Sequence, residues 1–137
     1  MATKITAAEM VKPFTVLVVD DEDYLLKFVS IKLKVSGFQV LNATDGLKAL
    51  DIVRCGVIDL VVTDLIMPGL DGIELIRRIR GFSEVPIIVL TGYESEEKRA
   101  EALKAGADDF VTKPFDPDRL VARIEARKKL GTSTRHG

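Results

Sequence analysis

The sequence predicts an α/β fold in which five parallel strands alternate with five helices, and helices cover both faces of one sheet. Three observations predict this (βα)5 arrangement. Short runs rich in β-branched residues recur five times, and the longer segments between them carry apolar residues three or four positions apart. A glycine follows four of these longer segments, as is typical at helix ends: Gly37, Gly56, Gly81 and Gly106. Strand–helix–strand units of this length imply parallel strands in a doubly wound sheet.

The elements follow in order from these patterns. The predicted strands are residues 15–19, 38–41, 59–63, 86–90 and 109–112, and the first, third and fourth are almost wholly apolar, as strands buried on both sides are. In the first predicted helix, 23–36, Leu26, Val29 and Leu33 share one face and Lys27, Ser30 and Lys34 another. The other helices, with their apolar residues, are 46–54 (Leu47, Leu50, Val53), 71–80 (Ile73, Ile76, Ile79), 95–105 (Ala100, Leu103) and 116–130 (Leu120, Ile124).

The composition of the chain argues against several classes of protein, including nucleic-acid binders, disulfide-rich domains and membrane proteins. The 137 residues suit one domain, and 20 basic against 21 acidic residues leave a net charge of -1, which argues against a nucleic-acid partner. The single cysteine, Cys55, excludes an internal disulfide framework. No apolar run approaches the roughly 20 residues of a membrane span, and the N-terminus does not resemble a signal peptide. We therefore expect a cytoplasmic domain without a membrane partner.

The predicted domain occupies residues 14–130. Residues 1–13 precede the first strand as an N-terminal extension, and 131–137 are expected to form a flexible C-terminal tail. Because the tail is too short for a second core, we expect no output domain in the chain as given.

Polar side chains stand where the predicted strands end. Asp20 and Asp21 follow the first strand, Asp64 the third, Thr91 the fourth and Lys113 the fifth. Parallel sheets place ligand sites at the carboxyl ends of their strands, so these residues are expected to converge. Taken singly, each has an ordinary explanation, such as a helix cap, a turn residue or a solvated lysine.

Taken together, they point to phosphoryl chemistry. Converging carboxylates repel one another and require a cation, and oxygen ligands of this kind suit Mg²⁺. A lysine and a threonine can bind phosphoryl oxygens, while an aspartate can itself be the nucleophile and form an acyl phosphate. The sequence thus predicts a phosphoryl-transfer site whose nucleophile is a protein carboxylate.

Four motifs now carry a resemblance to a known family. They are VVDDE at 18–22, VVTDLIMPGLDG at 61–72, IVLTG at 88–92 and FVTKPF at 110–115. In this order, each at a strand end, they resemble the receiver domain of bacterial two-component response regulators of the CheY-like kind. The resemblance covers about residues 14–130. It implies a flavodoxin-like three-layer sandwich with the strand order 2-1-3-4-5.

The resemblance also implies residue roles at the metal site. Asp64 is the expected phosphoacceptor. Asp21 is expected to bind Mg²⁺ directly and Asp20 mainly through water, with the main-chain carbonyl of Ile66 as a further ligand. Lys113 is expected to pair with Asp64 at rest and with the phosphoryl group afterwards.

Further roles concern switching. Thr91 is expected to bond the phosphoryl group, and Phe110 to turn inward when Thr91 moves. The Lys113–Pro114 peptide bond is expected to be cis. From their positions at the mouth of the site, the bulky Ile66 and Tyr93 are expected to hinder attacking water and to prolong the phosphorylated state.

The implied function is a signalling switch rather than an enzyme, because the domain catalyses only its own phosphorylation and dephosphorylation. The phosphoryl donor is expected to be a phosphohistidine on a sensor histidine kinase or a phosphotransfer protein. The surface of the fourth helix, fifth strand and fifth helix is expected to change and to contact a downstream effector, an output domain or a second copy of the chain.

Three alternatives were weighed. A haloacid-dehalogenase-type phosphatase shares the residue types, and Asp21 and Asp23 have its spacing, but Leu25 replaces the residue expected after them. A receiver that binds partners without phosphorylation is not favoured, because all five key side chains are present. A receiver excised from a longer regulator, with a DNA-binding or enzymatic output domain, stays open on sequence alone, as do the cognate kinase and the pathway.

Overall fold

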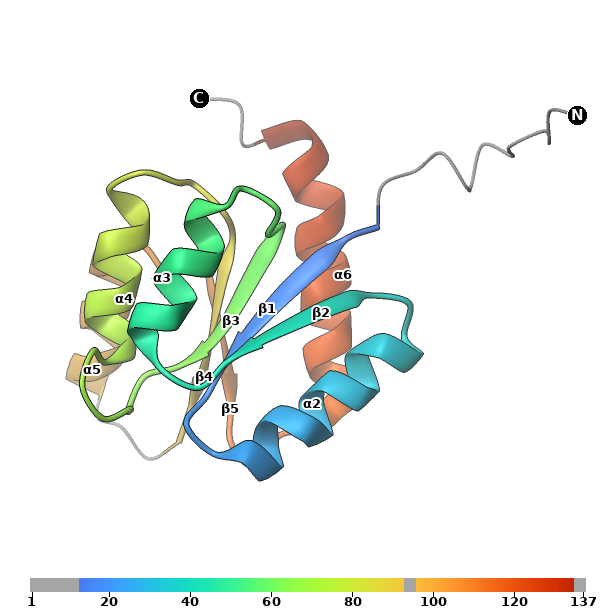
Figure 1. The fold of residues 1–137 in the computed structure, drawn as a ribbon, viewed down its shortest axis with the longest axis horizontal. Coiled ribbons are helices and arrows are strands. Elements are labelled where there is room, and N and C mark those ends of the chain that lie inside the picture. Colours follow the sequence, from blue (N-terminus) through green and yellow to red (C-terminus); the bar gives the residue numbers. More distant parts are fainter. Residues whose placement is uncertain (1–12, 93–95, 135–137) are drawn as a thin grey trace, which may run out of the picture.

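The structure, a computed structural model, describes residues 13–92 and 96–134. Strands and helices alternate along it (Figure 1). The strands are β1 (Thr15–Val19), β2 (Gln39–Ala43), β3 (Leu60–Asp64), β4 (Ile87–Thr91) and β5 (Asp109–Thr112). The helices are α2 (Asp23–Val35), α3 (Gly46–Arg54), α4 (Gly72–Arg80), α5 (Glu96–Ala105) and α6 (Pro117–Thr134).

All four strand pairings are parallel, in the order β2-β1-β3-β4-β5. This order confirms the predicted doubly wound fold. The chain first moves from β1 to one edge and then crosses back to β3, so the strand order reverses beside β1. Val19 pairs with Thr63, and the carboxyl ends of β1 and β3 therefore lie next to each other at the reversal point.

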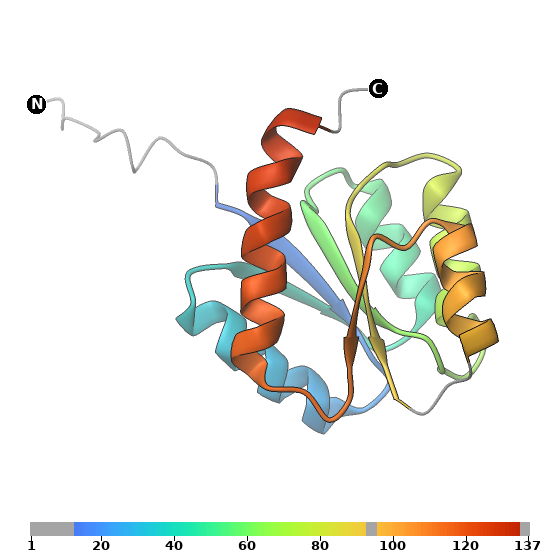
Figure 2. The same ribbon diagram turned by 180° about the vertical axis from the view of Figure 1, so that it is seen from behind.

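Two apolar layers hold the sheet. Helices α3, α4 and α5 pack on one face, and α2 and α6 pack on the other, as the two opposite views show (Figure 2). The side chains of β1, β3 and β4 are buried along their whole length, as predicted for strands covered on both faces. Burial of this kind fixes the strand register, because a slip of one residue would exchange the two faces.

Several details differ from the sequence prediction. In α5, Ala100 and Leu103 are exposed, and Ala102 is the buried residue instead. The helix packs mainly against α4 rather than squarely on the sheet, so its buried line is displaced by about one position. Ser30, predicted on the polar face of α2, is buried because its hydroxyl donates to Asn42 Oδ1 at 2.8 Å.

One exposure and one boundary also differ, the boundary being the end of α6, where residues 131–134 of the predicted flexible tail are helical. Leu47, placed on the apolar face of α3, is 60% exposed, because it stands in the first turn of the helix beside the edge strand β2. Helix α6 continues past Leu130 to Thr134. A glycine at position 131 costs only about 1 kcal/mol relative to alanine in a helix, and no proline stops the helix there.

Candidate functional site

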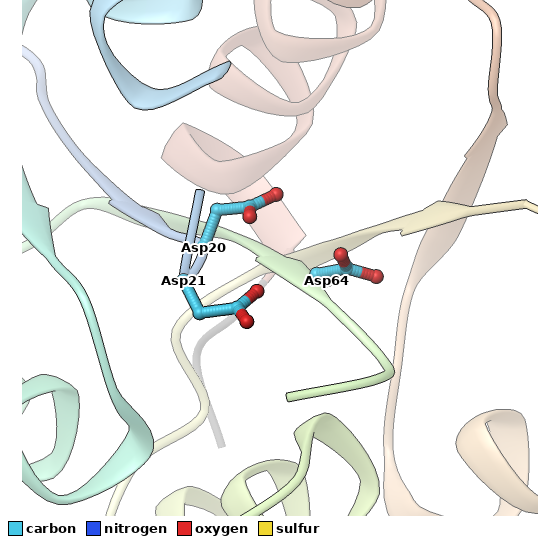
Figure 3. A group of neighbouring side chains, drawn as sticks. All are labelled: Asp20, Asp21 and Asp64. Atoms are coloured by element: carbon cyan, nitrogen blue, oxygen red, sulfur yellow. The ribbon is translucent and has the colours of Figure 1, made fainter. Parts of the chain in front are cut away.

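The site lies at the carboxyl ends of β1 and β3. Asp20 and Asp21 follow β1 directly, and Asp64 is the last residue of β3. Their carboxylates point toward one another (Figure 3), and one oxygen from each lies within 4.8 Å of the others. Asp20 and Asp64 are buried, whereas Asp21 is exposed. The topology thus brings together the three acidic side chains that the sequence predicts for the metal site.

Lys113 enters the same cluster from the end of β5. Its Nζ donates to Asp64 Oδ2 at 2.9 Å and lies 3.6 Å from Asp20 Oδ2. The peptide bond between Lys113 and Pro114 is cis. The main-chain N–H of Lys113 donates to the carbonyl of Thr91, which anchors this turn to the end of β4.

Burial sets the electrostatics of the cluster. Loss of hydration raises the pKa of the Asp20 carboxyl, and the hydrogen bond from the Glu22 N–H and the attraction of Lys113 offset this only in part. For Lys113, burial opposes the charged form, but its hydrogen bond to Asp64 and its attraction to Asp64 and Asp20 raise the pKa overall. The lysine is therefore held positively charged, while Asp20 remains costly to ionise.

Asp64 is held on both carboxylate oxygens. Oδ1 accepts hydrogen bonds from the main-chain N–H groups of Leu65, at 2.7 Å, and Ile66, at 3.3 Å. Oδ2 accepts from Lys113. Contacts within the protein therefore hold this carboxylate in a defined orientation.

Two buried oxygens at the strand ends have no hydrogen-bond partner among residues 13–92 and 96–134. They are Asp20 Oδ2 and the hydroxyl oxygen of Thr91, at the end of β4. Such groups are rare in folded proteins and call for an explanation. A cation beside Asp20 and an anionic group beside Thr91 would satisfy both. The carboxylate oxygens also form the hard donor set that Mg²⁺ prefers, so the residues fit this metal.

The remaining predicted residues are placed as follows. The side chain of Ile66 is 59% exposed beside Asp64, and Phe110 is half-buried against the core shared by α3, α4 and α5. Tyr93 lies outside the described residues. One neighbour of the site was not predicted from the sequence: the backbone of Gly72, which touches Asp64 from α4.

An apolar stripe on the outer face of α2 was also not predicted from the sequence. Tyr24, Phe28, Ile31 and Val35 are all exposed, and their spacing of four, three and four residues is the signal that could have revealed them. A hollow of about 240 Å³ beside the stripe is lined by Tyr24, Leu25, Phe28, Lys113, Pro114 and Phe115. Lys113 lines this hollow and also contacts Asp64, so the hollow connects the stripe to the acidic cluster.

Fold and site together define a class: a doubly wound domain with a carboxylate cluster and a lysine at its ligand edge, arranged for phosphate and metal chemistry. Residues 16–125 match the model of the response regulator receiver domain. The chain belongs to this family, which confirms the resemblance seen in the sequence.

Known relatives of the chain support the same family assignment. The transcriptional regulatory protein KdpE of Mycobacterium tuberculosis is 40% identical over 118 residues, which cover 86% of this chain and 52% of KdpE. The chain thus spans about half the length of that relative. Among solved structures, the receiver domain of the Francisella response regulator 1452 has 36% identity and a TM-score of 0.80, covering 88% of this chain and 99% of that one. Vibrio cholerae chemotaxis protein CheY4 has 32% identity and a TM-score of 0.78, covering 84% and 98%.

Membership of this family defines the general role of the chain. The chain is a receiver domain of two-component response regulators, and domains of this family are signalling switches that interact with histidine kinases and output domains. They bind Mg²⁺ at an acidic pocket, and Asp20, Asp21 and Asp64 form a cluster here that could hold a metal ion. No helix in the described ranges is both long and apolar enough to cross a membrane.

Proposed function

We propose that this receiver accepts a phosphoryl group on Asp64 from a phosphohistidine of a sensor histidine kinase or phosphotransfer protein. The observation that carries the proposal is the contact of Lys113 with a buried Asp64 carboxylate that stands beside two further acids. A purely structural ion pair would not need the additional carboxylates, because they repel Asp64 and weaken the folded state.

Transfer forms a bond between an Asp64 carboxylate oxygen and phosphorus, and it breaks the phosphorus–nitrogen bond of the donor. The donor histidine takes up a proton and leaves as neutral imidazole. Lys113 stands where its ammonium group can bind a phosphoryl oxygen and oppose the charge that develops during transfer. Bound Mg²⁺ supplies further positive charge to the phosphoryl oxygens.

The ligands proposed for Mg²⁺ are Asp21 directly, Asp20 mainly through water, Asp64, and the main-chain carbonyl of Ile66. The convergence of the three carboxylates supports this set, as does Asp20 Oδ2, which accepts no hydrogen bond from the described residues. Hydrated Mg²⁺ retains several waters in protein sites, which suits a cluster with one exposed side.

Switching follows from the two residues that phosphorylation can recruit. The unpartnered Thr91 hydroxyl can donate to a phosphoryl oxygen, and its movement leaves space for the ring of Phe110 to turn inward. The affected surface is formed by α5, β5 and α6, the fourth helix, fifth strand and fifth helix of the sequence analysis. We assign contact with an effector, an output domain or a second copy to this surface.

The first test is the intact mass of the protein after incubation with acetyl phosphate. The wild type is expected to gain one phosphoryl group in the presence of Mg²⁺ and none when the metal is chelated. Asp64→Asn is expected to gain none in either condition, while keeping the wild-type fold by circular dichroism. Phosphorylation of the Asp64→Asn protein to the wild-type extent would overturn the assignment of the acceptor.

The lifetime of the phosphorylated state depends on access of water to Asp64. The exposed side chain of Ile66 supports a shielding role, and Tyr93 is assigned the same role from its sequence position. Ile66→Asn and Tyr93→Glu are expected to accelerate loss of the phosphoryl group severalfold, whereas Ile66→Leu retains the wild-type rate. Unchanged decay in both polar variants would show that bulk at these positions does not control hydrolysis.

The donor must approach the open side of the cluster, which the apolar stripe of α2 borders. We assign docking of the phosphodonor protein to this stripe, since Lys113 belongs both to the acceptor site and to the hollow beside the stripe. Burial of such side chains against a partner is a common source of binding energy.

Ile31→Lys tests this assignment. With a histidine kinase that labels the wild type, transfer is expected to slow about tenfold, as for loss of an interface anchor. With acetyl phosphate, which needs no docking, the rate is expected to stay unchanged. Leu47→Lys is the matched control, because Leu47 is 60% exposed on α3 and Ile31 is 64% exposed. Equal slowing in both variants, or slowing with acetyl phosphate, would contradict it.

The length of this chain relative to KdpE suggests a second candidate function. Because this chain corresponds to about half of KdpE, we propose as the alternative a receiver module that works within a longer regulator carrying an output domain.

A further inference from the structure

The connection from β3 to α4 folds back on itself, so that the start of α4 lies against the proposed acceptor. Gly72, the first residue of α4, donates its N–H to the carbonyl of Leu65 at 2.9 Å. A Cβ added at Gly72 would lie 2.2 Å from the carbonyl oxygen of Asp64 and 2.7 Å from Leu65 Cα. These distances are far below van der Waals contact, so the position has no room for a side chain.

The atoms that such a Cβ would meet all belong to the main chain. A flexible side chain could rotate away, but the peptide group between Asp64 and Leu65 can yield only by moving the backbone of β3. That same peptide group is fixed elsewhere, since the Thr63 hydroxyl donates to the Asp64 carbonyl at 2.9 Å. The N–H of Leu65 in turn orients the Asp64 carboxylate.

The next peptide group, between Leu65 and Ile66, contains the Leu65 carbonyl that accepts from Gly72. The peptide group after it, between Ile66 and Met67, contains the Ile66 carbonyl proposed as a metal ligand. The hydrogen bond from Gly72 to the Leu65 carbonyl therefore holds the backbone directly between the acceptor and that ligand. We infer that Gly72 is a positioning residue: its backbone, packed without a side chain against Asp64 and Leu65, sets the acceptor carboxylate and the Ile66 carbonyl in place for Mg²⁺ and phosphoryl transfer. The inference rests on the proposed function of Asp64.

A second glycine provides a matched control. Gly46 is the first residue of α3, as Gly72 is of α4, and in both helices the preceding aspartate caps the N-terminus through its side chain. A Cβ at Gly46 would also be crowded, at 2.8 Å from the Leu70 carbonyl oxygen and 2.9 Å from Leu70 Cβ. The two sites thus share helix position, capping and crowding, but only Gly72 touches the acceptor.

The experiment compares Gly72→Ala with Gly46→Ala in the full chain. Three quantities are measured: the free energy of unfolding in urea, Mg²⁺ affinity by calorimetry, and the rate of phosphorylation by acetyl phosphate. Both variants are expected to lose stability. Gly72→Ala alone is expected to bind Mg²⁺ about tenfold more weakly, the size of effect seen when a group that orients a metal ligand is lost. Its phosphorylation is expected to slow about a hundredfold, as for a misplacement of about 1 Å.

Mg²⁺ affinity and phosphorylation rate of Gly46→Ala are expected to stay within about twofold of the wild type, because the atoms crowded at Gly46 belong to Leu70 and not to Asp64 or Leu65. Wild-type Mg²⁺ affinity and rate in a folded Gly72→Ala protein would overturn the inference. So would equal losses in the two variants, because they would indicate general destabilisation. If the wild type itself gains no phosphoryl group on Asp64, the proposed function fails first.

Amide hydrogen exchange of the wild type tests the inference even if Gly72→Ala does not fold. Coupling between two sites is reciprocal, so a contact that positions the metal ligands must itself be stabilised when Mg²⁺ binds. Saturating Mg²⁺ is expected to slow exchange of the Gly72 amide and to leave the Gly46 amide unchanged. Equal behaviour of the two amides would contradict the positioning role.

Discussion

Charged side chains lie largely buried at both ends of the strands: at their amino ends, here the amino edge, and at their carboxyl ends, the carboxyl edge. The two groups differ in how far hydrogen bonds satisfy them. At the amino edge, Arg80 donates to the carbonyls of Gly106, Ser83 and Val85 at 2.7–3.1 Å and to Asp108 at 3.0 Å. Asp108 also accepts from the N–H of Ile87, at the start of β4. At the carboxyl edge, three carboxylates converge, and Lys113 contacts those of Asp20 and Asp64. Within the part of the chain that the structure describes, buried oxygens of Asp20 and Thr91 have no hydrogen-bond partner.

This difference separates a structural use of buried charge from a functional one. A buried ion pair is tolerated when hydrogen bonds satisfy its remaining donors and acceptors, as they do around Arg80. Unpartnered buried oxygens weaken the folded state, and the cluster keeps capacity for a ligand at that cost. Mutations at the amino edge should therefore change stability, and those at the carboxyl edge should change chemistry.

The largest expected effect is at the amino edge. Arg80→Met leaves Asp108 without its closest cation and removes hydrogen bonds from three main-chain carbonyls. The free energy of unfolding is expected to fall by about 2–3 kcal/mol, somewhat less than for a fully buried pair, because Arg80 and Asp108 are 18% and 10% exposed. Urea denaturation measures it. Folded Arg80→Met protein should still be phosphorylated at the wild-type rate.

Arg78→Met is the control for Arg80. Arg78 contacts Glu74 at 3.2 Å, but both side chains are more than 40% exposed. A change within about 0.5 kcal/mol is expected, because exposed ion pairs contribute little. Similar losses in the two variants would show that burial and backbone contacts at Arg80 do not have the assigned importance.

Sequence reasoning predicted most of the fold because the signals were strong and redundant. The β1, β3 and β4 runs are short, rich in β-branched residues and bounded by turn signals, which favours buried strands. Polar residues follow every strand except β2, and the topology brings Asp20, Asp64 and Lys113 together. Helix α5 was harder, because its outer and inner faces differ little in polarity and only packing against α4 decides that Ala102 is buried. The role of Gly72 was hidden for another reason: close approach of two backbone segments leaves no periodic pattern, only a glycine.

The smaller predicted effect concerns Asp20, at the carboxyl edge, and has the opposite sign. Asp20→Asn is expected to raise the free energy of unfolding at neutral pH by about 1–2 kcal/mol in metal-free buffer, because a buried charge is replaced by a neutral group of similar shape. The pH dependence follows from the raised pKa of Asp20. The folded protein retains this proton at pH values where the unfolded chain has lost it. The stabilising contribution of that proton is complete below the unfolded-state pKa and is lost as pH rises through the folded-state pKa.

The stability difference between Asp20→Asn and the wild type should therefore be small in acid and should grow as pH rises through the raised pKa of Asp20. Asp51→Asn, at an exposed position of α3, is the control for the change from carboxylate to amide. Mg²⁺ should reverse the order, because it stabilises the folded wild type by binding and binds the variant less well. If Asp20→Asn were instead less stable than the wild type in metal-free buffer, Asp20 would belong with Arg80 as a structural charge, and the contrast between the two edges would fail at this residue.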